Sequence, residues 1–589
     1  MEKSSSYYKI HSEKYHSEAR SLYKRMTLLS SLRLLVFLIT GIGIYITFSK
    51  WEIAVVIGVL GVILFIYLLS KHSDTKSRRD LFLALVKINT EEIDIASGKF
   101  HDRDSGTQFQ DPTHFYSLDI DLYGRGSFFQ FINRTTISEG TQKLANELMA
   151  NNIEGIVQRQ EAIKELSSKS KWRQYYSATS SLISVETKAQ KIIDWLHSHQ
   201  PFISKQLVWI PALFSAISGL LFLLVISQSI SPEYLGYWLL LGLGITAFFV
   251  KRINVLSHNT EKVKDTFKQY ALLLNQIESE TFSSALLQKK QQDIEAEHKK
   301  ASVIFSQFSK HLDSLDNRNN MISAIFGNGL FLSDIKNAMQ IEKWISRYNT
   351  TVEHWFEIVS FFDAYNSLGN YAFNHSDYVY PEIQSQATAI NSTELGHPLL
   401  NDAKRIDNDF KIDHQQFYII TGANMAGKST FLRTVSLQII MANIGLPVCA
   451  QSSIYSPVKL ITSMRTSDSL TDDSSYFFSE LTRLKFIVDA IQNDSYFIVL
   501  DEILKGTNST DKAIGSKKFV EKLVASNATG IIATHDLSLC EIESKLPEVK
   551  NYFFDAEIIN DELHFDYTFK KGICQNMNAS FLLKKMNIV

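Results

Sequence analysis

The sequence predicts an α/β domain in the last third of the chain, preceded by a mostly α-helical region that contains two apolar helical hairpins. Three observations predict this fold class. Charge-free apolar stretches occur in two close pairs, the segments around them have helical periodicity, and from about residue 380 strand-like runs alternate with helical ones. The 589 residues suffice for three or four domains of roughly 100–200 residues each.

Four stretches without a charged residue are close to the roughly 17–25 residues that cross a bilayer as a helix. They are Leu34–Ser49, Ile53–Ser70, Leu207–Ser227 and Tyr234–Val250. Short polar links join them into two hairpins, and basic residues flank the other ends, so the positive-inside rule places both termini in the cytoplasm. The alternative is a set of buried core helices in a large soluble protein. We expect an integral protein of the cytoplasmic (inner) membrane with four transmembrane helices, whose spans serve as anchors because they contain no ionisable group.

Composition excludes several other classes of protein. There are 60 Lys and Arg against 62 Asp and Glu, a net charge of -2, so any contact with nucleic acid must be local. The three cysteines, Cys449, Cys540 and Cys574, have neither the number nor the spacing of a disulfide framework or a zinc site.

Composition shifts and helical periodicity divide the chain into five parts. The second and fourth are predicted to be helical, the fourth with the Lys-, Glu- and Leu-rich composition of a lever, whose charge runs are either solvated helix faces or local nucleic-acid contacts. The parts are 1–80, a polar tail with the first hairpin; 81–205, a helical segment; 206–251, the second hairpin; 252–380, a lever-like region; and 381–589, the α/β domain.

The strongest motif follows the strand-like run Phe417–Thr421. Gly422-Ala423-Asn424-Met425-Ala426-Gly427-Lys428-Ser429-Thr430 has the G-x-x-x-x-G-K-S pattern of a P-loop and precedes a helical segment, as that motif requires. Its backbone amides and the start of the following helix suit phosphate groups, Lys428 suits their charge, and the Ser429 hydroxyl suits Mg²⁺. We therefore expect ATP and Mg²⁺ as cofactors.

Two further strand ends carry polar residues suited to ATP hydrolysis. Asp501 and Glu502 follow the strand-like run at 496–500, where one carboxylate can hold Mg²⁺ and the other can activate water. His535 follows the run at 529–533 and can reach the γ-phosphate. In isolation, such an acidic pair would more often be a helix cap, and the histidine would be a loop residue. With the P-loop they predict Lys428, Glu502 and His535 as catalytic residues and Asp501 with Ser429 as metal ligands.

These motifs resemble the MutS family of DNA mismatch-repair ATPases, whose phosphate loop reads T-G-P-N-M-G-G-K-S-T. Similar segments occur in the same order. They are Glu394–Pro398, Asn408-Asp409, Asp501-Glu502 with Gly506-Thr507, Ala533–His535 and Asn551-Tyr552, and upstream, more weakly, Leu122–Leu148, with Arg134 to Thr136 and Gly140, and Arg159–Leu166 as a core segment. The resemblance implies an ABC-type P-loop NTPase fold for the C-terminal domain.

The resemblance also implies a homodimer in which each nucleotide is closed by a signature segment of the partner subunit. In this chain that segment is Ser467–Glu480, with Ser475 as the residue that faces the nucleotide of the other subunit. Asp473 stands where the family commonly has glycine, and a carboxylate near phosphate is unfavourable unless it points away. The alternative for Ser475 is a helix cap without a role between subunits.

The front of the chain departs from the family. Residues 1–80 contain no counterpart of the mismatch-reading domain with its Phe-x-Glu wedge, and 251–380 leaves little room for a full DNA clamp. The sequence thus predicts a membrane-anchored MutS-like ATPase that hydrolyses ATP and couples it to DNA binding, of the mismatch-repair or DNA-structure-sensing type. The alternative is an ABC-type transporter or membrane-remodelling ATPase without DNA binding, and a third is a weakly catalytic scaffold that uses ATP to dimerise.

Overall fold

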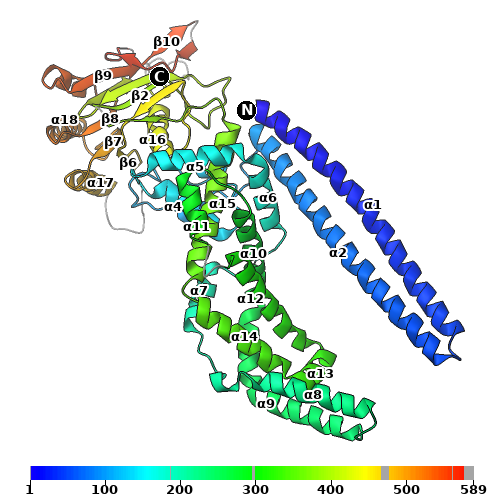
Figure 1. Ribbon diagram of the computed structural model, residues 1–589. Coiled ribbons are helices and arrows are strands. Elements are labelled where there is room, and N and C mark those ends of the chain that lie inside the picture. Colours follow the sequence, from blue (N-terminus) through cyan, green and yellow to red (C-terminus); the bar gives the residue numbers. More distant parts are fainter. Residues whose placement is uncertain are drawn as a thin grey trace.

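The computed structural model describes residues 2–185, 187–294, 299–385, 387–465, 476–559 and 562–575. The chain forms three parts (Figure 1). An α/β domain lies at one end, a long helical arm extends from it, and a separate two-helix hairpin diverges from the junction between them.

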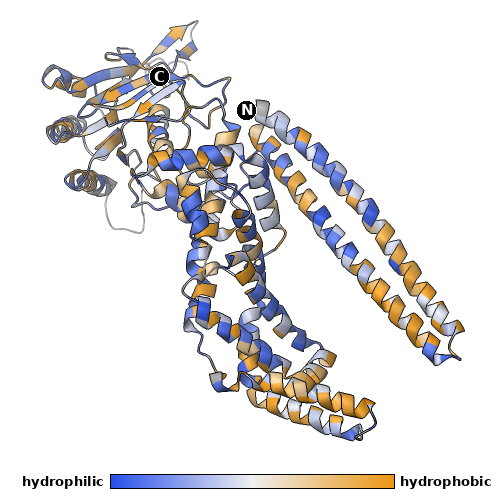
Figure 2. Ribbon diagram, in the orientation of Figure 1, coloured by the Kyte–Doolittle hydropathy of each residue, from blue (hydrophilic) through white to orange (hydrophobic). Residues whose placement is uncertain are grey.

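The first hairpin consists of two helices much longer than its apolar stretches, α1 (Glu2–Ile46) and α2 (Trp51–Ala96). The polar residues predicted as a tail are the first turns of α1, because no glycine or proline interrupts the chain before Gly41. The apolar residues occupy the half of the hairpin far from the α/β domain (Figure 2). In the near half, Tyr15 of α1 and Leu85 of α2 are buried against Ala178 of helix α6.

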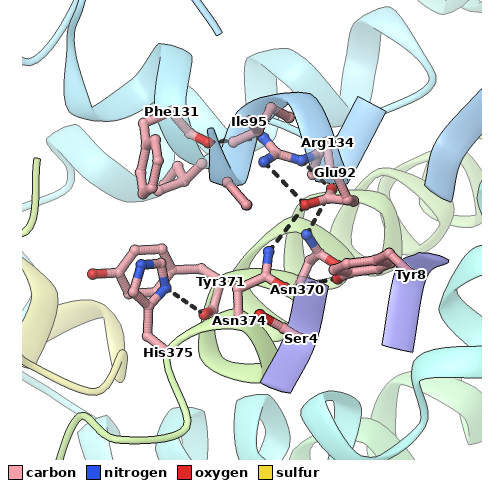
Figure 3. Close-up of a pocket in the computed structure, with 12 residues that line it drawn as sticks. Ser4, Tyr8, Glu92, Ile95, Phe131, Arg134, Asn370, Tyr371, Asn374 and His375 are labelled. Atoms are coloured by element: carbon pink, nitrogen blue, oxygen red, sulfur yellow. Dashed lines mark hydrogen bonds and ion pairs between the residues drawn. The ribbon is translucent and has the colours of Figure 1, made fainter. Parts of the chain in front are cut away.

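A buried polar network joins this hairpin to the junction (Figure 3). Glu92 of α2 pairs with Arg134 and accepts hydrogen bonds from the side-chain amides of Asn370 and Asn374, at 2.9 and 3.0 Å. The hydroxyl of Tyr8, on α1, donates to Asn374 Oδ1 at 2.7 Å. A cavity of about 20 Å³ beside these residues has room for one water molecule. The hairpin is therefore fixed to the junction by a charged and hydrogen-bonded contact as well as by apolar packing.

The junction is a helical body built around the long, almost fully buried helix α15. Its Asp363 carboxylate accepts hydrogen bonds from the N–H groups of Thr136 and Ile137, at 2.9 and 3.1 Å, just before α4. A Cβ atom at Gly140 would overlap this carboxylate, which explains why glycine stands there in the predicted core segment. The helices are α3 (Phe128–Ile132), α4 (Ser138–Met149), α5 (Ile156–Ser168), α6 (Ser170–Ser181) and α15 (Val352–Asn374), with the 3₁₀ turn η1 (Thr107–Phe109) before them.

The arm continues from α15 as a bundle of helices packed through aromatic side chains. Phe308 stacks on Trp344 with ring centroids 3.8 Å apart, and Phe267 meets both rings edge-on. The lever-like region predicted at 252–380 is helical in its described parts, and it consists of several separate helices. The arm comprises α7 (Ala189–Ser198), α10 (Lys264–Glu278), α11 (Ala285–Gln292), α12 (Ala301–Asp316), α14 (Ser333–Tyr348) and the short turns η2 (Lys205–Leu207) and η3 (Asn317–Asn319).

The far end of the arm is formed by α8 (Ile210–Ile226), α9 (Glu233–Glu261) and α13 (Met321–Phe331). All three are strongly apolar, as Figure 2 shows. Among the described residues, α1, α2 and α9 are long and apolar enough to cross a membrane, judged by length and composition only. The third predicted span, Leu207–Ser227, is shorter than expected, because helix α8 begins only at Ile210, with Pro211 in its first turn. Helix α13 was not among the predicted apolar segments.

The α/β domain contains a six-stranded sheet in the order β12-β9-β4-β8-β7-β6, parallel except for β12. A second sheet has the order β1-β5-β2-β3, and β10 and β11 form a separate hairpin. The strands are β1 (Glu382–Ile383), β2 (Thr388–Leu395), β3 (Asn408–Asp413), β4 (Phe417–Gly422), β5 (Ser452–Tyr455), β6 (Lys459–Ser463), β7 (Tyr496–Asp501), β8 (Thr529–Ala533), β9 (Val549–Phe554), β10 (Ala556–Ile559), β11 (Glu562–Phe565) and β12 (Lys570–Lys571). The helices are α16 (Lys428–Ile444), α17 (Tyr476–Ala490), α18 (Ser509–Ala525) and the 3₁₀ helix η4 (Leu537–Ser544).

The order of the central strands positions the site. Strands β4, β8 and β7 are parallel neighbours, so their carboxyl ends lie at one edge of the sheet. The P-loop follows β4, His535 follows β8, and Asp501 ends β7. Ligands of parallel α/β sheets bind at this edge.

Candidate nucleotide-binding site

The glycine-rich loop turns sharply between β4 and α16. Gly427 has a φ of 98° and Met425 a φ of 67°, in the left-handed region that glycine adopts without strain. Ala426 is buried beneath the loop, and its N–H donates to the Ala423 carbonyl at 3.3 Å. The Met425 side chain is exposed, so the left-handed residue at this position projects away from the loop. The turn of the loop is therefore held by residues in the left-handed region at Met425 and Gly427.

Lys428 begins α16 and is almost fully buried. Its Nζ donates to the carbonyl oxygens of Gly422 and Ala423 at 2.8 and 2.9 Å, which places the ammonium group inside the loop. Burial lowers the pKa of this ammonium, against the opposing influence of Asp501 and Glu502. The N–H groups of Lys428 and Ser429 open the helix and have no intrahelical partner, so the loop offers both N–H donors and a cation to phosphate oxygens.

The predicted metal ligands lie together. Ser429 Oγ donates to Asp501 Oδ2 at 2.6 Å, which brings a hydroxyl and a carboxylate oxygen to one point at the end of β7. Mg²⁺ takes few protein oxygens and completes its octahedron with water and substrate phosphates. This donor pair fits that requirement. Within the described parts of the chain, no group of three or more His, Cys, Asp or Glu is arranged to hold a metal ion.

The predicted base and the predicted sensor contact each other directly. His535 Nε2 lies 2.8 Å from Glu502 Oε1 and 3.4 Å from Lys428 Nζ. An ionised carboxylate only accepts, so Nε2 carries the proton that it shares with Glu502 and is unable to accept one from Lys428. The hydrogen bond from His535 lowers the pKa of Glu502 to about 2. Glu502 is therefore held as a carboxylate at the mouth of the loop.

These residues line a cleft of about 840 Å³, large enough for a nucleotide. Asn424, Met425, Gly427 and Thr430 also line it. The lining further includes residues of β2, β3, the loop between them and the segment after β11, which are Leu395, His397, Leu400, Lys404, Ile406, Asn408 and Tyr567.

Two of these lining residues, His397 and Asn408, belong to segments that resemble the MutS family in sequence. His397 lies in the 394–398 segment, and its burial, with Arg433 and Arg405 nearby, lowers its pKa to about 4, so it is neutral. Asn408 is the first residue of β3, and its side-chain amide donates to the Tyr567 carbonyl at 3.0 Å. The sequence analysis did not identify Tyr567 as a site residue. Its ring lies close to the P-loop, since a Cβ at Gly427 would lie only 3.0 Å from it. No local motif marks this tyrosine, because only the fold brings β11 and its following loop over the P-loop.

The signature segment is described only in part. Ser475 and Asp473 lie outside the described residues. Their neighbour Glu480 is buried in α17, where its Oε1 accepts a hydrogen bond from the N–H of Lys505 at 3.2 Å. This contact ties the helix after the signature segment to the loop that follows Glu502.

The fold and the site define a P-loop nucleotide-binding domain, with the loop after β4 and the carboxylates after β7. Comparison with known proteins gives a more specific match. Residues 418–584 match the family model described as MutS domain V. The described part of the matched region contains every predicted site residue except Ser475.

Curated relatives match the same end of the chain. Human MutS protein homolog 4 is 34% identical over 215 residues, which cover 34% of this chain and 22% of the relative. The DNA mismatch repair protein MSH4 of Arabidopsis thaliana is 32% identical over 197 residues, covering 32% and 24%. The DNA mismatch repair protein MutS of Staphylococcus haemolyticus is 28% identical over 259 residues, covering 42% and 29%. The chain thus spans less than a third of the length of these relatives, and the likeness supports a MutS-type ATPase domain.

Proposed function

We propose that this protein is a MutS-like ATPase that binds Mg²⁺-ATP in the cleft at the carboxyl edge of the central sheet and hydrolyses it. The observation that carries the proposal is the convergence of three groups from three neighbouring strands. Lys428 lies inside the P-loop, Ser429 bonds Asp501, and His535 bonds Glu502. A P-loop used only for structure would not need an oriented carboxylate beside the phosphate site.

Each side chain has a separate role in this proposal. Lys428 neutralises phosphate charge, and the Ser429 hydroxyl with Asp501 holds Mg²⁺, directly or through water. Bound Mg²⁺ supplies charge stabilisation for the phosphoryl group. Glu502 orients the attacking water and accepts its proton, while His535 keeps that carboxylate ionised and lies within reach of the γ-phosphate. Ser475 of a second copy completes the site in a homodimer, as the family resemblance implies.

We also propose that the protein is anchored in the cytoplasmic membrane, with both termini and the ATPase domain in the cytoplasm. Two features support this. Helices α1, α2 and α9 are long and apolar enough to cross a bilayer, and no residue in the apolar windows of α1 and α2 is buried. The apolar end of the first hairpin and the apolar end of the arm both point away from the α/β domain (Figures 1 and 2). A single bilayer can accept both ends while the ATPase remains in water.

The proposed work of the ATPase is coupled to DNA. This step rests on the relatives, two of which are named as DNA mismatch repair proteins. The second candidate is a membrane-remodelling or transport ATPase without DNA binding. It is favoured by the composition of the arm, whose far end consists of exposed apolar helices rather than basic ones.

Steady-state ATP hydrolysis by the detergent-solubilised protein tests both candidates. The variants Lys428→Ala and Glu502→Gln accompany the wild type, and paired, mispaired and branched DNA are added at two salt concentrations. We expect no hydrolysis with Lys428→Ala, ATP binding without turnover with Glu502→Gln, and stimulation by DNA that weakens as salt rises. Hydrolysis that depends on Lys428 but ignores every DNA would replace DNA coupling with the remodelling function. Hydrolysis undiminished in both variants would remove this cleft as the site.

A further inference from the structure

Helix α13 (Met321–Phe331) is an apolar insertion between two helices of the arm. It connects α12 to α14, and the chain from Asn319 to Ser333 contains no charged residue. The helix was invisible as a membrane candidate in the sequence because it is too short to span. At 1.5 Å per residue it is roughly 16 Å long, about half the roughly 30 Å of a bilayer's hydrocarbon core.

The charged residues that flank the insertion pair with each other at its base. Arg318 Nε lies 3.1 Å from Asp334 Oδ2, and both side chains are largely buried. Asn320 caps the start of α13 by accepting from the N–H of Ile322 at 3.0 Å, and Asn328 Oδ1 accepts from the N–H of Asp334 at 2.8 Å. The two flanking charges are thus paired, and N–H groups at the starts of α13 and α14 are hydrogen-bonded. The segment between the two charges, 319–333, is uncharged.

Small residues of the second hairpin, Gly242 and Ser218, contact the backbone of α13. A Cβ at Gly242 of α9 would overlap the carbonyl oxygen of Gly329, so the two helices cross at backbone distance. Ser218 Oγ of α8 donates to the Leu330 carbonyl at 2.6 Å and accepts from Trp238 Nε1 at 2.7 Å. Close crossing at glycine, with serine bonding across helices, is how helices associate in lipid, where apolar surface alone provides no driving force.

The outer face of α13 is exposed and apolar. Met321 is 73% exposed, Ile322 71% and Phe326 53%. Nearby, Leu223 of α8 is 64% exposed and Leu240 of α9 is 63% exposed, so the apolar surface extends over all three helices. In the chain segment that contains α13, the charged residues next to this surface are Arg318 and Asp334, where the segment joins the arm.

We propose that α13 is a third membrane-embedded element of the arm, a helix that enters the lipid beside the α8–α9 hairpin and returns without crossing. This inference rests on the proposed membrane anchoring. The exposed face contacts the acyl chains of the bilayer, because it is uncharged and adjoins the exposed apolar residues of the α8–α9 hairpin. The helix does not cross the bilayer, because it is too short. The end of α12 and the start of α14 then lie at the membrane surface. The arm is therefore connected to the bilayer at both ends of α13 as well as at both ends of the α8–α9 hairpin.

Fluorescence quenching in proteoliposomes of the full chain tests the proposal. An environment-sensitive probe is attached at Phe326→Cys on α13, at Phe222→Cys on α8 as the lipid reference, and at Val303→Cys on α12 as the aqueous reference. The three positions have similar exposure, 53%, 56% and 45%, and the three native cysteines are buried. Ile322→Cys provides a second site on α13 if the first variant fails to fold. Brominated lipids quench from the bilayer and iodide quenches from water.

We expect bromolipid quenching at residue 326 within about twofold of that at residue 222, and iodide quenching at least about threefold weaker than at residue 303, because ions are excluded from hydrocarbon. Iodide quenching at 326 equal to that at 303, with residue 222 still quenched by lipid, would place α13 in water and overturn this inference alone. Protection of residue 326 from both quenchers would mean that protein covers it, which also overturns the inference. Absence of lipid quenching at residue 222 as well would overturn the membrane anchoring itself.

Discussion

Replacing His535 with alanine tests whether this histidine keeps the predicted catalytic carboxylate ionised. Its Nε2 is 2.8 Å from Glu502 Oε1, and this hydrogen bond is the largest cause that lowers the pKa of Glu502 from 4.5 to about 2. Burial raises the pKa, electrostatic attraction by His535 lowers it further, and weaker attraction by Lys505 and Lys512 also lowers it. Without His535, we expect the pKa of Glu502 to return to about its ordinary value or above it.

The size of the effect follows from that pKa. A change from 4.5 to about 2 favours the ionised carboxylate by roughly 3 kcal/mol, at about 1.4 kcal/mol per tenfold change in the ionisation constant. Because the active form of a base is the ionised form, the wild type keeps about nine-tenths or more of its Glu502 as the base above about pH 3. In His535→Ala, about half of the Glu502 side chains are protonated near pH 4.5, and the fraction grows as the pH falls.

The assay is the pH dependence of kcat/KM for ATP, which reports ionisations of the free enzyme. We expect His535→Ala to show a new acidic limb below about pH 5.5 that the wild type lacks. His354→Ala is the matched control, because His354 lies 3.7 Å from Glu357 in an exposed pair on α15, remote from the cleft. Superimposable acidic limbs in the wild type and His535→Ala would refute the assignment of the ionised Glu502 to His535.

Three further predictions concern the junction and are measured by thermal unfolding in detergent. Gly140→Ala is expected to destabilise by about 1–3 kcal/mol, since the new Cβ overlaps Asp363, whereas exposed Ser138→Ala in the same turn changes little; equal effects would refute the steric argument. Burial raises the pKa of Asp363 to about 7, above its unfolded value of about 3.9, so stability falls as pH rises from about 4 to 7, and Asp363→Asn should flatten this slope. Glu92→Gln should cost roughly 3 kcal/mol by leaving Arg134 buried without its counter-charge, and Arg134→Met added to it should restore part of the loss; additive losses would contradict pairing.

The nucleotide site was predictable because each of its motifs is local. A P-loop needs its glycines and Lys428 within one turn, and the residues at 501–502 and 535 end strands whose apolar pattern is visible in the sequence. Parallel neighbouring strands then bring these ends together without further information. The direct bond between His535 and Glu502, and the placement of Tyr567 over Gly427, depend on tertiary distances that no local pattern encodes.

The helical half was predictable in class but not in length. Apolar runs mark where a helix suits lipid, but they do not mark its ends, so α1 and α2 continue through polar turns that pack on the junction. Helix α13 escaped prediction for the opposite reason. An eleven-residue, mostly apolar helix resembles an ordinary core helix in sequence, and only the fold shows that its outer face has no protein against it among the described residues.

A continuous set of bonded helices links the phosphate loop to the first hairpin. Helix α16 carries Lys428 at its start, and the carbonyl of Asn443 at its end accepts two hydrogen bonds from Arg159 of α5, at 3.0 and 2.7 Å. Arg159 opens the second upstream segment that resembles the family, and this contact gives its physical reason. Helix α5 packs along α15, whose last turns hold Glu92 of α2 (Figure 3).

The contact between α16 and α5 and the contact between α15 and α2 are buried and hydrogen-bonded, and α5 packs along α15 between them. A shift of α16 that accompanies phosphate binding must therefore move α5 and α15 with it or break charged bonds in a poorly solvated interior, which costs several kcal/mol. The arm adjoins the same helix, because α15 begins shortly after α14 ends. The first hairpin and the arm thus both contact α15, and the nucleotide cleft is connected to it through α16 and α5, so we expect a movement at the cleft to reach both apolar ends through α15.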